Sequence, residues 1–262
     1  MNRKFFVTAA VLCLASILNA GTYTRVFEKT YPLASGGQFS LRNTNGSIHV
    51  ESWNKNEVYV KAVITVKSGS RRTAEDLMEQ TEIQVNASPE KISVITRQPS
   101  SRGWNFLGWI FGGGGQVSVS YTIHVPDELN LSLRNTNGKV TVKDAAGDME
   151  ISTTNGVIDG THLSGNISAR TTNGNVRLRL KQAGEKDRID ARTTNGGVNI
   201  HIPAKTNADI EARTVNGSIS TDIPLKIQGR HSRRQLSGMI GNGGGALIRL
   251  RTTNGSIRIR EL

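Results

Sequence analysis

A repeated tripeptide, Thr/Val-Asn-Gly, constrains the fold of this 262-residue chain more than any other feature. It occurs seven times, centred on Asn45, Asn137, Asn155, Asn173, Asn195, Asn216 and Asn254. Apolar residues lie six and four residues before every one of these asparagines, and three residues after it. Because a whole apolar frame is copied together with the tripeptide, the repeat marks a structural unit.

Each unit has the pattern of a strand, an Asn-Gly corner and a second strand. Apolar and polar residues alternate with period two, as in 176–180, which is typical of a strand with one buried face. Asn-Gly supplies the positive backbone angles that a tight corner needs. Antiparallel hairpins with two-residue turns fit this pattern, and so does a parallel β-solenoid with rungs about 4.8 Å apart.

Identical residues at matching positions favour the solenoid, because stacked copies can bond along the array. Two threonine positions recur beside the asparagines. The first comprises Thr153, Thr171, Thr193, Thr214 and Thr252, and the second Thr44, Thr136, Thr154, Thr172, Thr194 and Thr253. The 38 residues from Asn216 to Asn254 correspond to about two units, which predicts a degenerate unit within residues 225–245.

The fold class predicted is all-β, a β-solenoid (parallel β-helix-like) with a β-rich N-terminal module. Residues 21–126 form that module and include the first repeat, while residues 127–262 form the solenoid. Within the module we expect strands at 58–66, 92–95 and 117–125 and one short helix at 74–80, capped by Thr73. The module is expected to cover one end of the array, whose strand edges would otherwise be open.

Residues 1–20 have the pattern of a secretory signal peptide. Arg3 and Lys4 precede an apolar run from Phe5 to Leu18 that is too short to favour a stable membrane span; an uncleaved anchor is the alternative. The only cysteine, Cys13, lies in this run, so the mature chain would contain no disulfide. We therefore expect an exported protein, periplasmic or on the cell surface.

The chain resembles the bacterial putative-adhesin domain family, a β-solenoid-type domain of unknown function. The residues that carry the resemblance are the strand 117–126 ending in Val-Pro, the unit 131–142, the successive Thr-Asn-Gly units and the glycine-rich segment 238–245. The resemblance covers about residues 22–262. It implies a solenoid architecture and an adhesin-like role.

Arginine lies three residues before the asparagine in six of the seven units, and Ser152 takes its place in the other. These candidate ligand-binding residues are Arg42, Arg134, Arg170, Arg192, Arg213 and Arg251. Their position alternates with the buried ones, so they should form an outward row that suits a repeating polyanion. Glu150, Asp190 and Glu211 lie two residues before this position and would neutralise part of the row. A solvated surface that discourages sheet aggregation is the alternative.

The net charge of +12 favours acidic partners. The expected partner is an acidic polysaccharide, lipopolysaccharide or another envelope polyanion, with no sequence-specific nucleic acid. A protein partner or a membrane surface could contact the aromatic segment through Trp104, Phe106, Trp109 and Phe111, unless that segment instead covers the solenoid end. Residues 230–234 form a basic loop.

Catalytic motifs and Cys/His metal spacings do not occur in the sequence, so we expect no enzyme activity, no catalytic residues, no metal and no cofactor. Two alternatives stay open. One is a polysaccharide-processing enzyme on a β-helix scaffold, in which acidic and basic side chains would converge in one cleft. The other is a structural scaffold that binds a protein partner.

Overall fold

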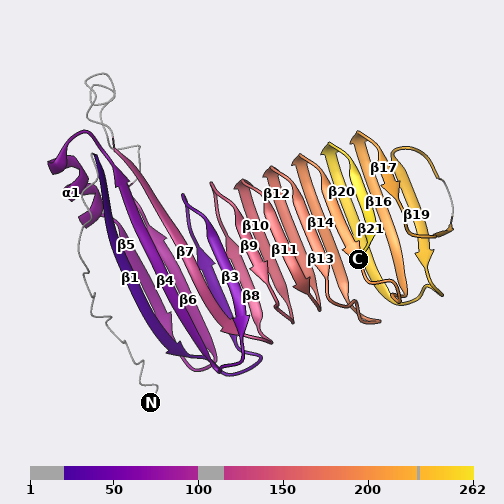
Figure 1. Cartoon of the computed structure of the whole chain (residues 1–262), viewed down its shortest axis with the longest axis horizontal. Helices are drawn as coiled ribbons and strands as arrows, with labels where there is room; N and C mark the ends of the chain where they lie inside the picture. The colour runs from indigo at the N-terminus through magenta and orange to yellow at the C-terminus, as the bar shows by residue number, and fades with distance from the viewer. Residues whose placement is uncertain (1–20, 100–114, 229–230) are drawn as a thin grey trace, which may run out of the picture.

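The computed structural model describes residues 21–99, 115–228 and 231–262. These residues form two long β-sheets that lie face to face in an elongated stack (Figure 1). Within this part of the chain there is one helix, α1 (Arg71–Glu79). The prediction of an all-β, solenoid-type fold is confirmed.

The first sheet has ten strands. In spatial order they are β1 (Thr22–Pro32), β4 (Glu57–Lys67), β7 (Gln116–Pro126), β3 (Ile48–Trp53), β9 (Val140–Lys143), β11 (Ile158–Leu163), β13 (Val176–Leu180), β15 (Val198–Ile202), β21 (Ile257–Glu261) and β17 (Ile219–Thr221).

The second sheet has eleven strands. In spatial order they are β18 (Lys226–Ile227), β19 (Gln235–Ile240), β16 (Ala208–Asn216), β20 (Ala246–Asn254), β14 (Arg188–Asn195), β12 (Ile167–Asn173), β10 (Met149–Asn155), β8 (Asn130–Arg134), β2 (Gln38–Arg42), β6 (Lys91–Arg97) and β5 (Glu82–Ala87).

Every repeat unit contributes one strand to each sheet, and the Asn-Gly corner joins the two strands. Units stack in parallel, so that Ile151 of β10 lies opposite both Leu133 of β8 and Ala169 of β12. This parallel register excludes the hairpin alternative. Every repeated apolar position is buried between the sheets except Ile219, which is half-buried in the terminal strand β17. The apolar frame of the repeat is therefore the core of the fold.

The asparagines of the corners form one continuous ladder of side-chain amides. Each Nδ2 donates to the Oδ1 of the neighbouring asparagine over 2.7–2.9 Å, from Asn45 at one end to Asn216 at the other. The Asn45 amide in turn donates to Gln98 over 3.2 Å. The ladder explains why asparagine recurs at this position, because an amide is both donor and acceptor.

The inner threonines also bond along the stack, although to backbone rather than to one another. The hydroxyls of Thr171, Thr193, Thr214 and Thr252 donate to the glycine carbonyl of the neighbouring corner over 2.8–2.9 Å. In the first two units asparagine takes this place, and the Asn135 amide donates to the Gly46 carbonyl over 2.9 Å. Each corner is therefore fixed to its neighbour by two side-chain bonds.

We expect Asn173→Asp to lower the free energy of unfolding by about 1–2 kcal/mol. The amide of Asn173 donates to Asn155 Oδ1 over 2.7 Å, whereas an aspartate would place a charged acceptor against that oxygen. Urea unfolding followed by circular dichroism measures the change. Thr172→Asp is the matched control, because it adds the same charge at an exposed neighbouring position outside the ladder. Equal losses in the two variants would contradict a contribution from the ladder.

The N-terminal module extends both sheets at one end of the stack. β4 pairs antiparallel with both β1 and β7, and β5 pairs antiparallel with β6. The three expected strands are confirmed as β4, β6 and β7, whereas β1 and β5 were missed. The first repeat stacks directly on the second, β2 against β8 and β3 against β9, although more than 70 residues separate them in sequence.

The helix α1 begins earlier than predicted. Ser70 is its N-cap, with an extended backbone (φ −116°, ψ 125°) and a hydroxyl that accepts a hydrogen bond from the Thr73 backbone N–H. The prediction of Thr73 as the cap is therefore wrong, because Ser70 already satisfies that N–H from the position before the first turn. Ala74 and Leu77 bury the inner face of the helix in the common core.

The last repeat does not follow the preceding repeat in space. β20 lies between β14 and β16, and β21 lies between β15 and β17, so the final unit occupies a slot between two earlier ones. The described residues of this segment, 225–228 and 231–245, contain no further rung. Instead, β18 and β19 pair antiparallel and β19 covers the open edge of β16. The prediction of a degenerate unit there is wrong, because these residues carry the chain out past β16 and back into the slot.

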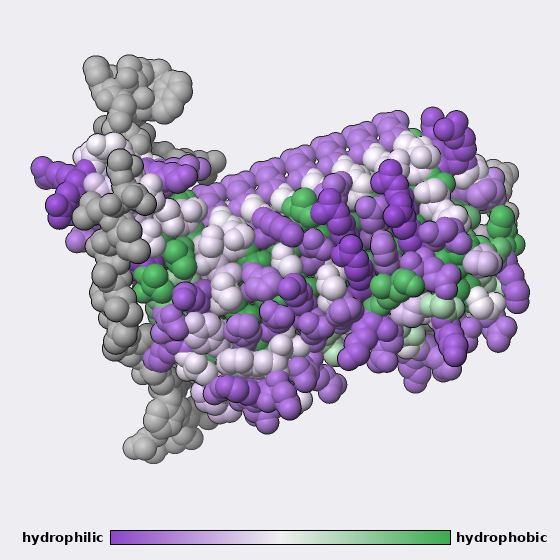
Figure 2. Space-filling view, in the orientation of Figure 1, coloured by the Kyte–Doolittle hydropathy of each residue, from purple (hydrophilic) through white to green (hydrophobic). Residues whose placement is uncertain are grey.

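Polar side chains cover most of the outer surface. In the view of Figure 2 hydrophobic residues show only as small separate patches, and a regular hydrophilic row follows the upper edge of the stacked strands. The single helix in the described part of the chain has nine residues, too few to span a bilayer.

Candidate functional site

The repeated arginines lie side by side on the outer face of the eleven-stranded sheet, as their offset from the core predicts. We call them the Arg row. Its order across the sheet is Arg42, Arg134, Ser152, Arg170, Arg192, Arg251 and Arg213, with the serine as its one interruption. All six arginines are exposed except Arg192, which is half-buried. With rungs about 4.8 Å apart, the row extends over roughly 30 Å.

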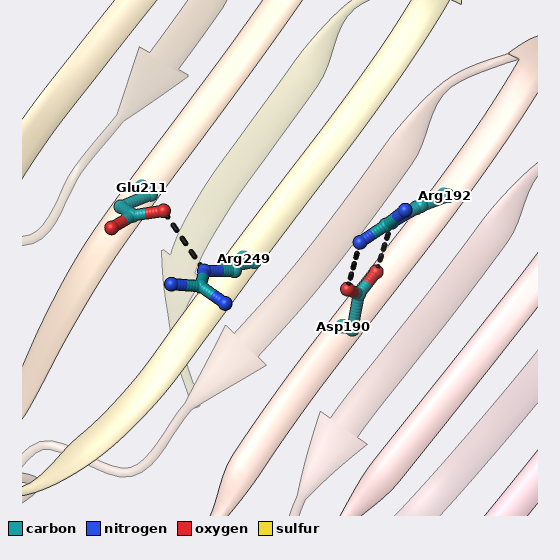
Figure 3. Close-up of polar contacts among 4 residues, drawn as sticks. All are labelled: Asp190, Arg192, Glu211 and Arg249. Atoms are coloured by element: carbon teal, nitrogen blue, oxygen red, sulfur yellow. Dashed lines mark hydrogen bonds and ion pairs between the residues drawn. The ribbon is translucent and has the colours of Figure 1, made fainter.

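Acidic side chains neutralise part of the row. Arg192 binds Asp190 on its own strand through two hydrogen bonds of 2.6 and 2.5 Å (Figure 3). These bonds raise the pKa of the Arg192 guanidinium, while its partial burial opposes the change. Arg134 binds Glu150 of the next strand over 3.2 Å. These two arginines are therefore less available to a ligand than the others.

Glu211 does not neutralise the arginine two residues after it. Its carboxylate accepts a hydrogen bond of 2.9 Å from Arg249 on the adjacent strand β20 (Figure 3). The reason is the position of β20, which brings Arg249 directly opposite Glu211. Among the described residues, four members of the row have no carboxylate within 4.0 Å: Arg42, Arg170, Arg213 and Arg251.

A groove of about 810 Å³ runs across the strands on the same face of this sheet. It crosses β2, β8, β10, β12, β14 and β20, next to the Arg row. Small polar side chains such as Ser132 and Ser168 contribute to its lining, together with Arg170 from the row. Serine occupies the outward position two residues before the repeated arginine position in three units, and its short side chain leaves room beside Glu150, Asp190 and Arg249.

The charged groups in the groove are of both signs, and neighbours hold its acids. The basic lining residues are Arg170, Lys186, Arg188 and Arg249, and the acidic ones are Asp148, Glu150 and Asp190. Asn166 donates to Asp148 over 2.8 Å, while arginines bind Glu150 and Asp190. Each acid of the groove is therefore bound by a neighbouring side chain, and the groove is a polar surface suited to contact with a ligand.

The other predicted site lies outside the described residues. Trp104, Phe106, Trp109 and Phe111 fall within 100–114, so the structure does not place the aromatic segment. Part of the predicted basic loop is described. Its Arg234 lines a pocket of about 230 Å³ together with Arg213, at the end of the Arg row.

Sequence reasoning missed a second group of arginines, on the outer face of the ten-stranded sheet. Arg177 and Arg179 of β13 and Arg258 and Arg260 of β21 flank the strand β15, which presents His201 between them. The signal available in the sequence is an Arg-x-Arg pattern directly after two of the seven corners. Only the position of β21 next to β15 brings the two copies together.

The histidines and acids of the described residues do not gather into a metal-binding group. Within residues 21–99, 115–228 and 231–262, no group of three or more His, Cys, Asp or Glu side chains is placed to hold a metal ion. Of the histidines, His49, His124 and His201 are half-buried on strand surfaces, as predicted, and His162 contacts Asp144 over 3.0 Å at a corner.

Comparison with known proteins identifies a family and a fold. The family model described as Toastrack DUF4097 matches residues 34–260. The solved structure of a protein described as a putative cell adhesion protein from Clostridium sporogenes is 12% identical, with a TM-score of 0.53, and the alignment covers 90% of this chain and 100% of that one. No curated protein matches the sequence significantly.

A second solved structure is less similar. It is described as a putative adhesin from Bacteroides fragilis and is 11% identical, with a TM-score of 0.39, over 89% of this chain and 96% of that one. At these identities the structural likeness concerns the fold, and any binding activity has to be argued from the side chains of this chain.

Proposed function

The chain belongs to the Toastrack DUF4097 family, and on this premise we propose that it is an exported, non-catalytic, adhesin-like protein of the bacterial cell envelope that binds an acidic polymer through the Arg row. The observation that carries the proposal is the parallel register, which repeats one guanidinium per rung on a single face. A guanidinium presents a planar fork that suits carboxylate or phosphate groups.

The part of the row with the most arginines available to a ligand lies on four adjacent strands, β12, β14, β20 and β16. Arg170, Arg251 and Arg213 have no carboxylate within 4.0 Å among the described residues, and Arg192 lies between them bound to Asp190. A polymer with a charge on every unit could contact several of these arginines at once. Each further contact is then intramolecular, which raises the overall affinity over that of a single unit.

Export and envelope location rest on the sequence of residues 1–20 and on the adhesin-like family. The absence of catalysis is supported by the groove, where Asp148, Glu150 and Asp190 are each held by a neighbouring side chain. A polysaccharide-processing enzyme would need an acid that is free to exchange a proton with its substrate.

We expect the triple variant Arg170→Ser, Arg213→Ser, Arg251→Ser of residues 21–262 to bind polygalacturonate about 10-fold to 150-fold more weakly than the unmodified chain. Three exposed charge pairs of about 0.5–1 kcal/mol each give a loss of this size. Binding of the unmodified chain should also weaken from low to high salt. Calorimetry or surface-based binding measurements at two salt concentrations test both expectations, with dextran as the neutral polymer.

The matched control is the triple variant Arg177→Ser, Arg258→Ser, Arg260→Ser, which removes the same charge from the opposite sheet. It should bind polygalacturonate as the unmodified chain does. Equal weakening in both variants would assign binding to net charge and overturn the proposed site. Binding that is indifferent to salt and to both variants would instead indicate an uncharged contact, for which the segment 104–111 is the first candidate.

A further inference from the structure

A compact cluster of basic side chains lies on the outer face of the ten-stranded sheet, opposite to the face that carries the Arg row. Three adjacent strands contribute to it. Arg177 of β13, Asn199 of β15 and Arg258 of β21 share one line across the strands. The next outward line consists of Arg179, His201 and Arg260. We call these six residues the basic cluster.

The spacing of the strands sets the size of the cluster. Neighbouring strands are about 4.8 Å apart, so the arginines of β13 and β21 start about 10 Å apart across β15. Alternate residues of one strand are about 7 Å apart. The four guanidiniums therefore arise from the corners of a rectangle, with Asn199 and His201 at the midpoints of its two long sides. Arg258 and Arg260 are exposed, and Arg177 and Arg179 are half-buried.

Acids contact this cluster only at its margins. Asp159 on the neighbouring strand β11 lies 3.9 Å from Arg179 but 3.1 Å from Lys139, which is its closer partner. On the other side Asp222 follows β17, and its carboxylate accepts a hydrogen bond from the Glu261 backbone N–H over 3.1 Å. Among the described residues, Arg177, Arg258 and Arg260 have no carboxylate within 4.0 Å.

The cluster imposes a net positive field on the histidine at its centre. Burial lowers the pKa of His201, and the charges of Arg179 and Arg260 lower it further, while Asp222 opposes them. The lowered pKa favours the neutral imidazole. A bound anion would offset the two arginines and raise the pKa of His201, so anion binding should be accompanied by proton uptake at this ring.

The acids at the margins limit what the cluster can bind. A long polyanion laid along the stack would meet Asp159 on one side and Asp222 on the other, and the like charges would repel it. A ligand that fits between these acids avoids the repulsion. Because guanidiniums approach from both sides of β15, two anionic groups separated by about the width of two rungs can each be bound by the arginines of one strand.

We infer that the basic cluster is a second anion site, separate from the Arg row, that takes a compact ligand bearing two phosphate groups. The ligand is either a soluble phosphorylated sugar or the headgroup of a phosphorylated lipid, which share this chemistry. The cluster lies on the outer face of the sheet, with Arg258 and Arg260 exposed, so either source can reach it. This inference stands independently of the proposed function, because its residues lie on the other sheet.

The test is binding of fructose 1,6-bisphosphate, with inorganic phosphate as the single-phosphate comparison. We expect at least about tenfold tighter binding of the bisphosphate. The double variant Arg177→Ser, Arg260→Ser should lose at least about tenfold in affinity for it, whereas Arg170→Ser, Arg251→Ser should not. Equal affinity for the two ligands, or equal loss in the two variants, would overturn the site.

A second measurement needs no variant. In the unmodified chain, titration of the His201 ring signals by NMR should show a higher pKa with fructose 1,6-bisphosphate than without it. An unchanged His201 titration at saturating ligand would also overturn the site.

Vesicles of phosphatidylcholine with cardiolipin, which has two phosphates, distinguish the two sources of the ligand. If fructose 1,6-bisphosphate competes with the vesicles for the protein, the ligand is a lipid headgroup. If it does not compete, the ligand is soluble. Because polygalacturonate binding uses the other sheet, it can fail while this site stands.

Discussion

Removal of residues 246–262 is expected to unfold residues 208–240 instead of shortening the array by one rung. These residues form β20 and β21, which lie between β14/β15 and β16/β17. Ile248, Leu250, Ile257 and Ile259 are fully buried there. Burial of four such side chains is worth about 6–12 kcal/mol, which is comparable with the whole stability of a typical domain. The deletion would leave β16 and β17 without their parallel partners.

Hydrogen exchange measured by mass spectrometry tests this expectation. In the truncated chain, amides of residues 208–240 should exchange as in an unfolded peptide. Amides of β8 to β13 should stay protected, because repeats in a solenoid contact only their neighbours. A synthetic peptide of residues 246–262 should restore protection of β16 when added to the truncated chain.

The alternative outcome is equally clear. β16 and β17 carry the same apolar frame as β20 and β21, so they could dock directly on β14 and β15 once the slot is empty. Full protection of β16 in the truncated chain without the peptide would show that this happens. The insertion of the last repeat between β14/β15 and β16/β17 would then not be needed to keep β16 and β17 folded.

The same slot explains what the sequence could predict and what it could not. The repeated offsets predict strands, corners, buried residues and outward arginines, because all of these depend only on position within a unit. The order of the units depends on contacts between distant segments. Since β16 and β20 share one pattern, nothing in that pattern says which of them lies next to β14. The sequence therefore predicts the rung and leaves the order of the rungs open.

The candidate sites differ in the same way: one depends on position within a unit, and the other on the order of the units. The Arg row was predicted because its arginines share one offset in nearly every unit. The basic cluster was missed because Arg-x-Arg follows only two corners, and 81 residues separate Arg177 from Arg258 in sequence. Had the units stacked in chain order, β17 would lie next to β15, with Ser220 in the place of Arg258. The insertion of β21 thus creates the cluster.

Two strands of the N-terminal module were missed for a different reason. β1 buries only Phe27 and Tyr31 completely, and β5 buries none of its residues completely. Both are edge strands with a neighbour on one side only. Strands at an edge need little apolar alternation, so periodicity of two, on which recognition of strands depends, is weak in them.

The corner glycines lead to the second large effect. We expect Gly174→Ala to lower the free energy of unfolding by about 2–5 kcal/mol. Gly174 has φ +154°, and a Cβ at this position would lie 2.0 Å from the carbonyl oxygen of Gly156 in the neighbouring corner. The backbone angle costs about 1–2 kcal/mol in a residue with a Cβ, and the collision with backbone adds about 1–3 kcal/mol.

Gly244→Ala is the matched control, because it separates the two contributions. Gly244 also has a positive φ, of +66°, but a Cβ there would have no atom within 4 Å. It should therefore cost only about 1–2 kcal/mol, from the backbone angle alone. Urea unfolding of both variants measures the difference. Since the stacked corners repeat the contact at Gly174 in every rung, a large difference means that the rung spacing itself excludes any residue but glycine. Equal costs would mean that the corners can separate to admit a methyl group, and the Asn ladder beside them would then be the weaker constraint on the stack.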